Sequence, residues 1–120
     1  MSKSECVLGV PKNEKGIQLI EMTYEVYTPE LENDLEWFKF TASEIDDVFD
    51  LFFDFNEKLG TLIDFYEEDE IVADKIPEAL QIAKKHFDKT PDQSKKRTIK
   101  KIIEALQLAN DTKMPVGFFF

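Results

Sequence analysis

Residues 43–59 read SEIDDVFDLFFDFNEKL and are the most strongly patterned part of this 120-residue chain. At about 100° per residue, the apolar side chains fall on one arc of a helix and the carboxylates on the opposite arc. The apolar arc comprises Ile45, Val48, Phe49, Phe52, Phe55 and Leu59. The opposite arc, which we call the acidic stripe, comprises Asp46, Asp50, Asp54 and Glu57. The pattern predicts one amphipathic helix that is capped by Ser43, with Asp46 as the partner of the cap three residues later, and that ends at Gly60.

The acidic stripe has little local compensation. Like charges four residues apart on a helix cost about 0.2–0.5 kcal/mol per pair, and Asp46/Asp50 and Asp50/Asp54 are two such pairs. Only Asp54 has a favourable partner at this spacing, Lys58. Repulsion within the stripe destabilises the helix, and nearby bases do not neutralise most of it. This indicates a surface that binds a positively charged partner. The alternative is an ordinary solvated helix face.

Phe53 lies beside the apolar arc rather than at its centre. Leu51 flanks the arc in the same way. An aromatic side chain next to uncompensated carboxylates is typical of an interface anchor, because binding hot spots favour aromatic residues ringed by polar groups. The alternative for Phe53 is packing under a neighbouring loop.

The flanking segments alternate between strand and helix patterns. Period-two alternation predicts a strand over 16–28, a weaker strand over 6–10, and strands over 37–41, 61–66 and 114–120. Two more helices are predicted, one capped by Asp74 and one beginning at Thr90 and ending at Asn110–Lys113. The three terminal phenylalanines require a strand that is paired inside a sheet. We therefore expect a single α+β domain over 1–120, with a mainly antiparallel sheet of about four to five strands packed by about three helices.

Charge is distributed unevenly along the chain. Residues 1–80 carry 21 acids and 6 bases, a net charge of −15, whereas residues 81–120 carry 4 acids and 9 bases, a net charge of +5. An acidic run, Glu67 to Glu70, follows Asp64, and four like charges in a row should face water or a partner. The basic cluster, defined as Lys95, Lys96, Arg97, Lys100 and Lys101, either pairs with the acids or stays apart from them.

Bulk composition disfavours several classes of partner. A net charge of −10 disfavours nucleic acid and anionic membranes, because both are bound by clustered Lys and Arg. No apolar run reaches the roughly 18 residues that span a bilayer, and the N-terminal segment lacks the pattern of a signal peptide. The single Cys6 has no partner for an internal disulfide. We expect a cytoplasmic protein.

The chain offers few groups for catalysis. His86 is the only histidine and is expected to act as a cation near a helix C-terminus. The glycines form no phosphate-binding loop, and no calcium-loop pattern occurs. We therefore predict no catalytic residue, no metal and no cofactor, although a small enzyme that uses carboxylates is the remaining enzymatic alternative.

Three segments resemble a known group of proteins: DVFDLFFDFNEKLGTLID at 47–64, EEDEIVADKIPEALQIAKK at 67–85 and LANDTKMPVGFFF at 108–120. Over roughly residues 36–120, this acidic chain is similar to small cytosolic immunity proteins of bacterial polymorphic toxin and contact-dependent growth inhibition systems. The resemblance implies a protein that is not an enzyme and that binds and blocks a cognate toxin domain, often a basic nuclease. An acidic surface would mimic the phosphates that such a toxin binds.

The predicted partner-binding residues combine the acidic stripe, Phe53 and the acidic run. They are Asp46, Asp50, Phe53, Asp54, Glu57, Asp64, Glu67, Glu68, Asp69 and Glu70. The alternative function is an acidic adaptor or regulatory module that binds a basic protein without neutralising a toxin.

Overall fold

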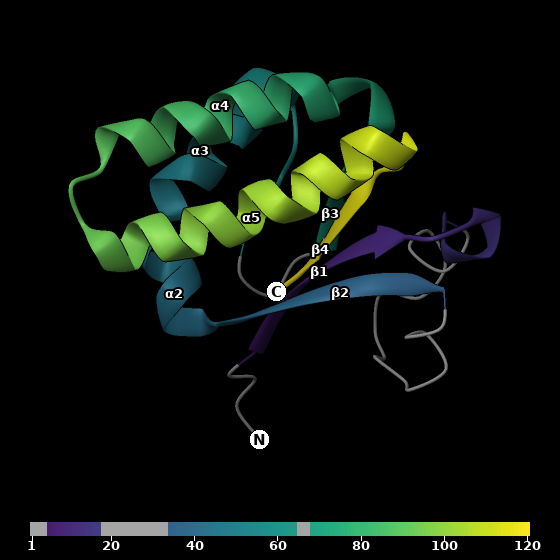
Figure 1. Ribbon diagram of the computed structural model, residues 1–120, viewed down its shortest axis with the longest axis horizontal. Coiled ribbons are helices and arrows are strands. Elements are labelled where there is room, and N and C mark those ends of the chain that lie inside the picture. Colours follow the sequence, from purple (N-terminus) through teal and green to yellow (C-terminus); the bar gives the residue numbers. More distant parts are fainter. Residues whose placement is uncertain (1–4, 18–33, 65–67) are drawn as a thin grey trace.

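The computed structural model describes residues 5–17, 34–64 and 68–120, and the fold is α+β, as predicted. The strands are β1 (Glu5–Pro11), β2 (Leu35–Thr41), β3 (Glu68–Ile71) and β4 (Val116–Phe119). The helices are α2 (Ala42–Asp47), α3 (Phe49–Leu59), the 3-10 helix η2 (Ala73–Lys75), α4 (Ile76–Lys89) and α5 (Gln93–Thr112). Figure 1 shows α4 and α5 side by side above the strands.

The four strands form one antiparallel sheet in the order β2-β1-β4-β3. The last strand, β4, lies between β1 and β3, which confirms the prediction that the terminal phenylalanines are paired inside a sheet. Phe118 and Phe120 are buried, and both rings contact Phe52 of α3. The terminal strand is therefore part of the core.

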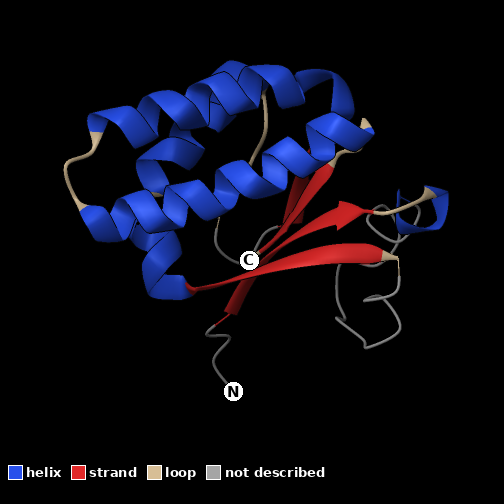
Figure 2. Cartoon of the chain, viewed as in Figure 1, coloured by secondary structure: helices blue, strands red, loops and turns tan. Residues whose placement is uncertain are grey.

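The helices cover one face of the sheet (Figure 2). Alternation along the strands directs Leu8, Phe40 and Phe118 into the main core, where they join Phe52 and Ile102 from the helices. On the opposite face, Leu35, Trp37 and Phe119 form a smaller apolar cluster. The helices α2 and α3, which carry the acidic stripe, thus lie on the side of the sheet that carries the main core.

The segment 43–59 is not one helix, contrary to the prediction. The chain turns at Val48, which separates α2 from α3. In a straight helix, residues 45 and 51 would point about 120° apart, with residue 48 between them, and Ile45, Val48 and Leu51 are all buried. The turn therefore separates two helices while all three side chains stay in the core. Gly60 ends α3 in the left-handed conformation, φ 74°, as predicted.

Three predicted helix caps are wrong. Thr41, not Ser43, caps α2: its hydroxyl accepts a hydrogen bond from the Glu44 amide, and the Glu44 carboxylate accepts one from the Thr41 amide. Asp74 lies within η2, and α4 begins without a side-chain cap. Asp92, not Thr90, caps α5. Thr41 and Asp92 have the extended backbone of a cap residue, and their side chains reach amides two or three residues further along the chain.

The strand predicted over 61–66 is also misplaced. Residues 61–64 have no regular secondary structure, and β3 begins at Glu68, inside the acidic run. Pairing with β4 overrides the like charges of this run, because the backbone hydrogen bonds of a strand do not depend on its side chains. The strand predicted over 16–28 begins with residues 16 and 17, which are helical, and its remainder lies outside the described residues.

In the part of the chain that the structure describes, no helix combines the length and the apolar character needed to cross a membrane.

Candidate protein-binding surface

The outer side of α3 carries an exposed aromatic ring between carboxylates. Phe53 is 64% exposed, and Asp50 and Glu57 lie on the same side of the helix at spacings of three and four residues. The opposite side is buried through Leu51, Phe52, Phe55 and Leu59. The ring of Phe53 contacts the half-buried Phe49 edge-on, with centroids 5.2 Å apart. In the described part of the chain, neither a covering loop nor the main core buries Phe53.

Asp46 of α2 and Glu57 of α3 are exposed, at opposite ends of the stripe. Within residues 5–17, 34–64 and 68–120, no basic side chain forms an ion pair with either carboxylate. Asp50 is also largely exposed, with 78% of its side chain accessible. We call the set Asp46, Asp50, Phe53 and Glu57 the acidic ridge.

Asp54, the fourth member of the acidic stripe, faces a neighbouring helix instead of solvent. His86 of α4 places Nε2 2.6 Å from Asp54 Oδ2, and Lys58 places Nζ 3.8 Å from the same oxygen. The hydrogen bond from His86 holds the pKa of the Asp54 carboxyl below its usual range; the charge of Lys58 acts in the same direction, and burial opposes both. Asp54 is therefore a structural link between α3 and α4 as well as part of the stripe.

His86 lies between two carboxylates of α3. Its second ring nitrogen, Nδ1, is 3.7 Å from Asp50 Oδ2, and its side chain is only 19% exposed. The ring borders a cleft of about 320 Å³ whose other walls include Thr90, Lys89 and Lys95. This contact was not predictable from the sequence, because 32 residues separate His86 from Asp54.

The basic cluster does not neutralise the acidic ridge. Among the described residues, none of its five side chains forms an ion pair with a carboxylate. Lys96 donates to the Phe87 carbonyl, 2.9 Å away, and lies over the Phe87 ring. Lys101 donates to the Lys39 carbonyl and lies over the Phe40 ring. Two of the bases are thus engaged by carbonyl oxygens and aromatic faces, and the acids of the ridge remain available.

Asn56 joins the end of α3 to the segment 61–64. Its side chain accepts hydrogen bonds from Thr61 Oγ1, at 2.7 Å, and from the Ile63 amide, at 2.8 Å, and it donates to the Ile63 carbonyl, at 3.0 Å. The Leu62 amide in turn donates to Asp69 of β3, at 2.5 Å. These contacts bring the acidic run close to the C-terminal end of α3.

Asp64 and the acidic run that follows it differ in exposure. Asp64 is exposed, whereas Asp69 and Glu70 of the run are half-buried. The Asp69 carboxylate accepts hydrogen bonds from the Leu62 and Glu70 amides, which ties it to backbone. The side chain of Glu68 and the whole of Glu67 lie outside the described residues. Asp69 was predicted to face water or a partner, but its carboxylate instead binds these backbone amides.

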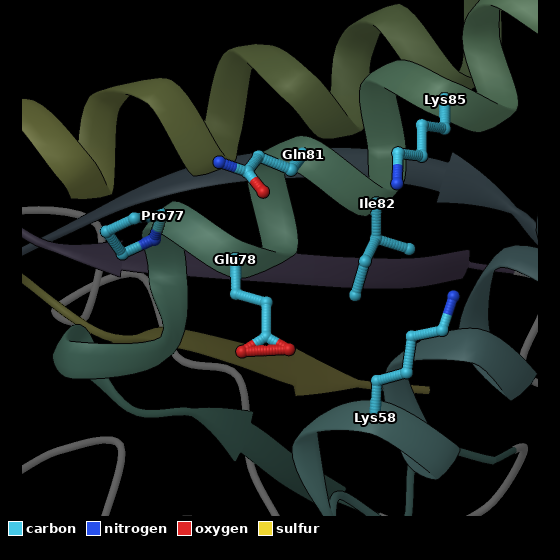
Figure 3. A pocket seen from close by; sticks show the side chains of 6 residues that line it. All are labelled: Lys58, Pro77, Glu78, Gln81, Ile82 and Lys85. Atoms are coloured by element: carbon cyan, nitrogen blue, oxygen red, sulfur yellow. The ribbon is translucent and has the colours of Figure 1, made fainter.

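A second, shallow pocket of about 440 Å³ lies between the end of α3 and the start of α4 (Figure 3). Lys58 extends from α3 toward Ile82 and Lys85 on α4, and Glu78 lies one turn from Ile82. Both signs of charge line this pocket, so it has no single electrostatic preference. The described ranges contain no group of three or more His, Cys, Asp or Glu side chains that could hold a metal ion.

Comparison of the chain with protein-family models, with curated proteins and with solved structures found no match.

Proposed function

We propose that the protein is a toxin-neutralising immunity protein that uses the acidic ridge to bind a basic toxin domain in the cytoplasm. The observation that carries the proposal is the exposure of Phe53 between Asp50 and Glu57, since no Lys or Arg of the described residues forms an ion pair with either carboxylate. An exposed aromatic ring supplies contact area, and the carboxylates around it supply attraction and orientation. The resemblance of residues 36–120 to immunity proteins supplies the kind of partner.

The proposed mechanism is steric and electrostatic, and it requires no catalytic group. A nuclease groove that binds phosphates is lined by Lys and Arg. Carboxylates at 46, 50 and 57 would pair with those cations, and Phe53 would enter an apolar site between them. Because Asp50, Phe53 and Glu57 lie on α3, whose opposite side is packed in the core, binding would require little rearrangement of these residues.

The test is co-expression with the toxin domain encoded directly upstream of this gene, with bacterial growth as the readout. The test variant is Asp46→Lys/Glu57→Lys, and the matched control is Asp74→Lys/Glu104→Lys, which makes the same change of net charge at exposed positions outside the ridge. We expect the parent and the control to restore growth and the ridge variant to fail. Rescue by the ridge variant would show that another face binds the toxin.

A binding measurement tests directly whether the acidic ridge contacts the toxin domain. With purified toxin domain, we expect the ridge variant to associate about tenfold or more slowly than the control variant at low ionic strength, and the difference to shrink as salt is added. If the parent restores no growth and binds no upstream toxin but captures another basic protein through the same residues, the adaptor function holds instead.

A further inference from the structure

The ring of His86 lies between the two carboxylates that face the boundary of α3 and α4. Nε2 is 2.6 Å from Asp54 Oδ2, and Nδ1 is 3.7 Å from Asp50 Oδ2. Asp50 and Asp54 are four residues apart on α3, a spacing at which like charges repel. A positive charge on the ring would lie between them and offset that repulsion.

The other charged groups around His86 are lysines from three helices, α3, α4 and α5. Lys58 of α3 contacts Asp54 at 3.8 Å, and Lys89 of α4 and Lys95 of α5 line the same cleft. Neither Lys89 nor Lys95 forms an ion pair with Asp50 or Asp54 in the described part of the chain. Histidine is the side chain whose ordinary titration falls between pH 5 and 8, and His86 is the only histidine in the sequence.

We propose that His86 is a proton-dependent counter-ion of the acidic ridge. Protonation places a positive charge against Asp50 and Asp54 and lowers the negative potential of the outer side of α3. Loss of the proton restores that potential, so the affinity for a cationic partner rises as the pH rises through the titration of His86. The effect on binding rests on the proposed function, whereas the counter-ion role itself does not.

The counter-ion role is tested on the full chain without any partner. The single histidine makes its ring signals unambiguous in an NMR titration from pH 5 to 9. We expect the side-chain carboxyl carbons of Asp50 and Asp54 to shift with the same midpoint as the His86 ring. The shared transition should be absent in His86→Gln. Carboxyl signals that stay constant while the ring titrates would overturn the inference.

The effect on binding is tested with a decalysine peptide as the cationic probe at low ionic strength. For the parent protein, we expect the dissociation constant to decrease about two- to fivefold across the His86 transition, because one unit of charge changes at close range. His86→Gln should lose this pH-dependent decrease in the dissociation constant. Any decrease that comes from the α-amino group should remain. Lys58→Gln is the matched control: it removes a permanent cation from Asp54, so it should bind more tightly and keep the pH-dependent decrease.

The two tests separate this inference from the proposed function. A concerted titration together with no decalysine binding at any pH would support the counter-ion role and contradict the acidic docking surface. Decalysine binding with the same pH dependence in the parent and in His86→Gln would leave the docking surface intact and overturn the regulation by His86.

Discussion

Nε2 of His86 lies 2.6 Å from Oδ2 of Asp54, across the boundary between α4 and α3. This contact joins two helices that the sequence pattern predicts only as separate amphipathic segments. It also removes one carboxylate from the set of four that the stripe was predicted to present to a partner. The acidic ridge therefore has fewer carboxylates than the acidic stripe, and one of them, Asp50, lies 3.7 Å from His86 of α4.

The Asp54–His86 contact predicts a specific acid dependence of stability. The folded-state pKa of Asp54 is lowered, so the contact stabilises the fold above the ordinary carboxyl pKa of about 3.9 and is lost as the pH falls through the lower folded value. We expect the free energy of unfolding to decrease below about pH 4, and Asp54→Asn to lack that part of the decrease. Urea unfolding between pH 2.5 and 6 measures it.

A double-mutant cycle checks the same pair at pH 6. Because both side chains are partly solvated, the coupling free energy between Asp54→Asn and His86→Gln should be about 0.5–1 kcal/mol. A coupling free energy of zero would mean that the hydrogen bond contributes nothing to the stability of the fold.

The position of the first helix cap is testable with three single variants. Thr41→Ala should lower the free energy of unfolding by about 1 kcal/mol, because the amide of Glu44 loses its acceptor. Thr41→Ser keeps the hydroxyl and should cost less, and Ser43→Ala should be close to neutral. A larger loss in Ser43→Ala than in Thr41→Ala would restore the cap predicted from the sequence.

Asn56 is expected to stabilise the junction between α3 and β3. Asn56→Ala removes three hydrogen bonds and should cost about 1–3 kcal/mol. Asn56→Asp keeps both acceptor contacts and loses only the donor, so it should cost less. Hydrogen exchange at the Ile63 amide reports the local effect: faster exchange in Asn56→Ala is expected, and unchanged exchange would argue against the junction.

Phe52 and Phe53 are adjacent in sequence and should respond oppositely to truncation. Phe52 is fully buried and contacts Phe118 and Phe120, so Phe52→Ala should cost about 3–5 kcal/mol of unfolding free energy. Phe53→Ala should change stability by about 0.5 kcal/mol or less and weaken toxin binding about tenfold. Thermal unfolding and binding kinetics on both variants separate the two roles. A Phe53→Ala variant that is destabilised but binds normally would assign the ring to packing.

The individual elements were predictable where local pattern and packing agree. The terminal strand, the end of the first helical region at Gly60 and the buried faces of α4 and α5 follow from alternation, glycine chemistry and helical periodicity. The break at Val48 was not predictable from periodicity, because the apolar residues of 45–59 fit the buried arc of one continuous helix. The caps failed for a related reason: several Ser, Thr and Asp residues stand near each helix start, and backbone conformation selects among them.

The acidic run shows how tertiary pairing can override a local preference. Four consecutive acids disfavour a strand in isolation, yet Glu68 to Ile71 pair with β4. The edge position of β3 makes this tolerable, because charged residues are common on edge strands.

Sequence by itself determined the fold class, the apolar side of the 43–59 region and the excess of carboxylates on its outer side, since these depend on residue type and spacing along one element. Only the tertiary structure decided which carboxylates stay exposed and which are engaged by other groups of the chain. Asp54 pairs with His86 and Asp69 with backbone amides, while Lys96 and Lys101 of the basic cluster bind carbonyl oxygens and aromatic rings. Such pairings depend on distances between residues far apart in the chain, and helical and strand periodicities do not encode those distances.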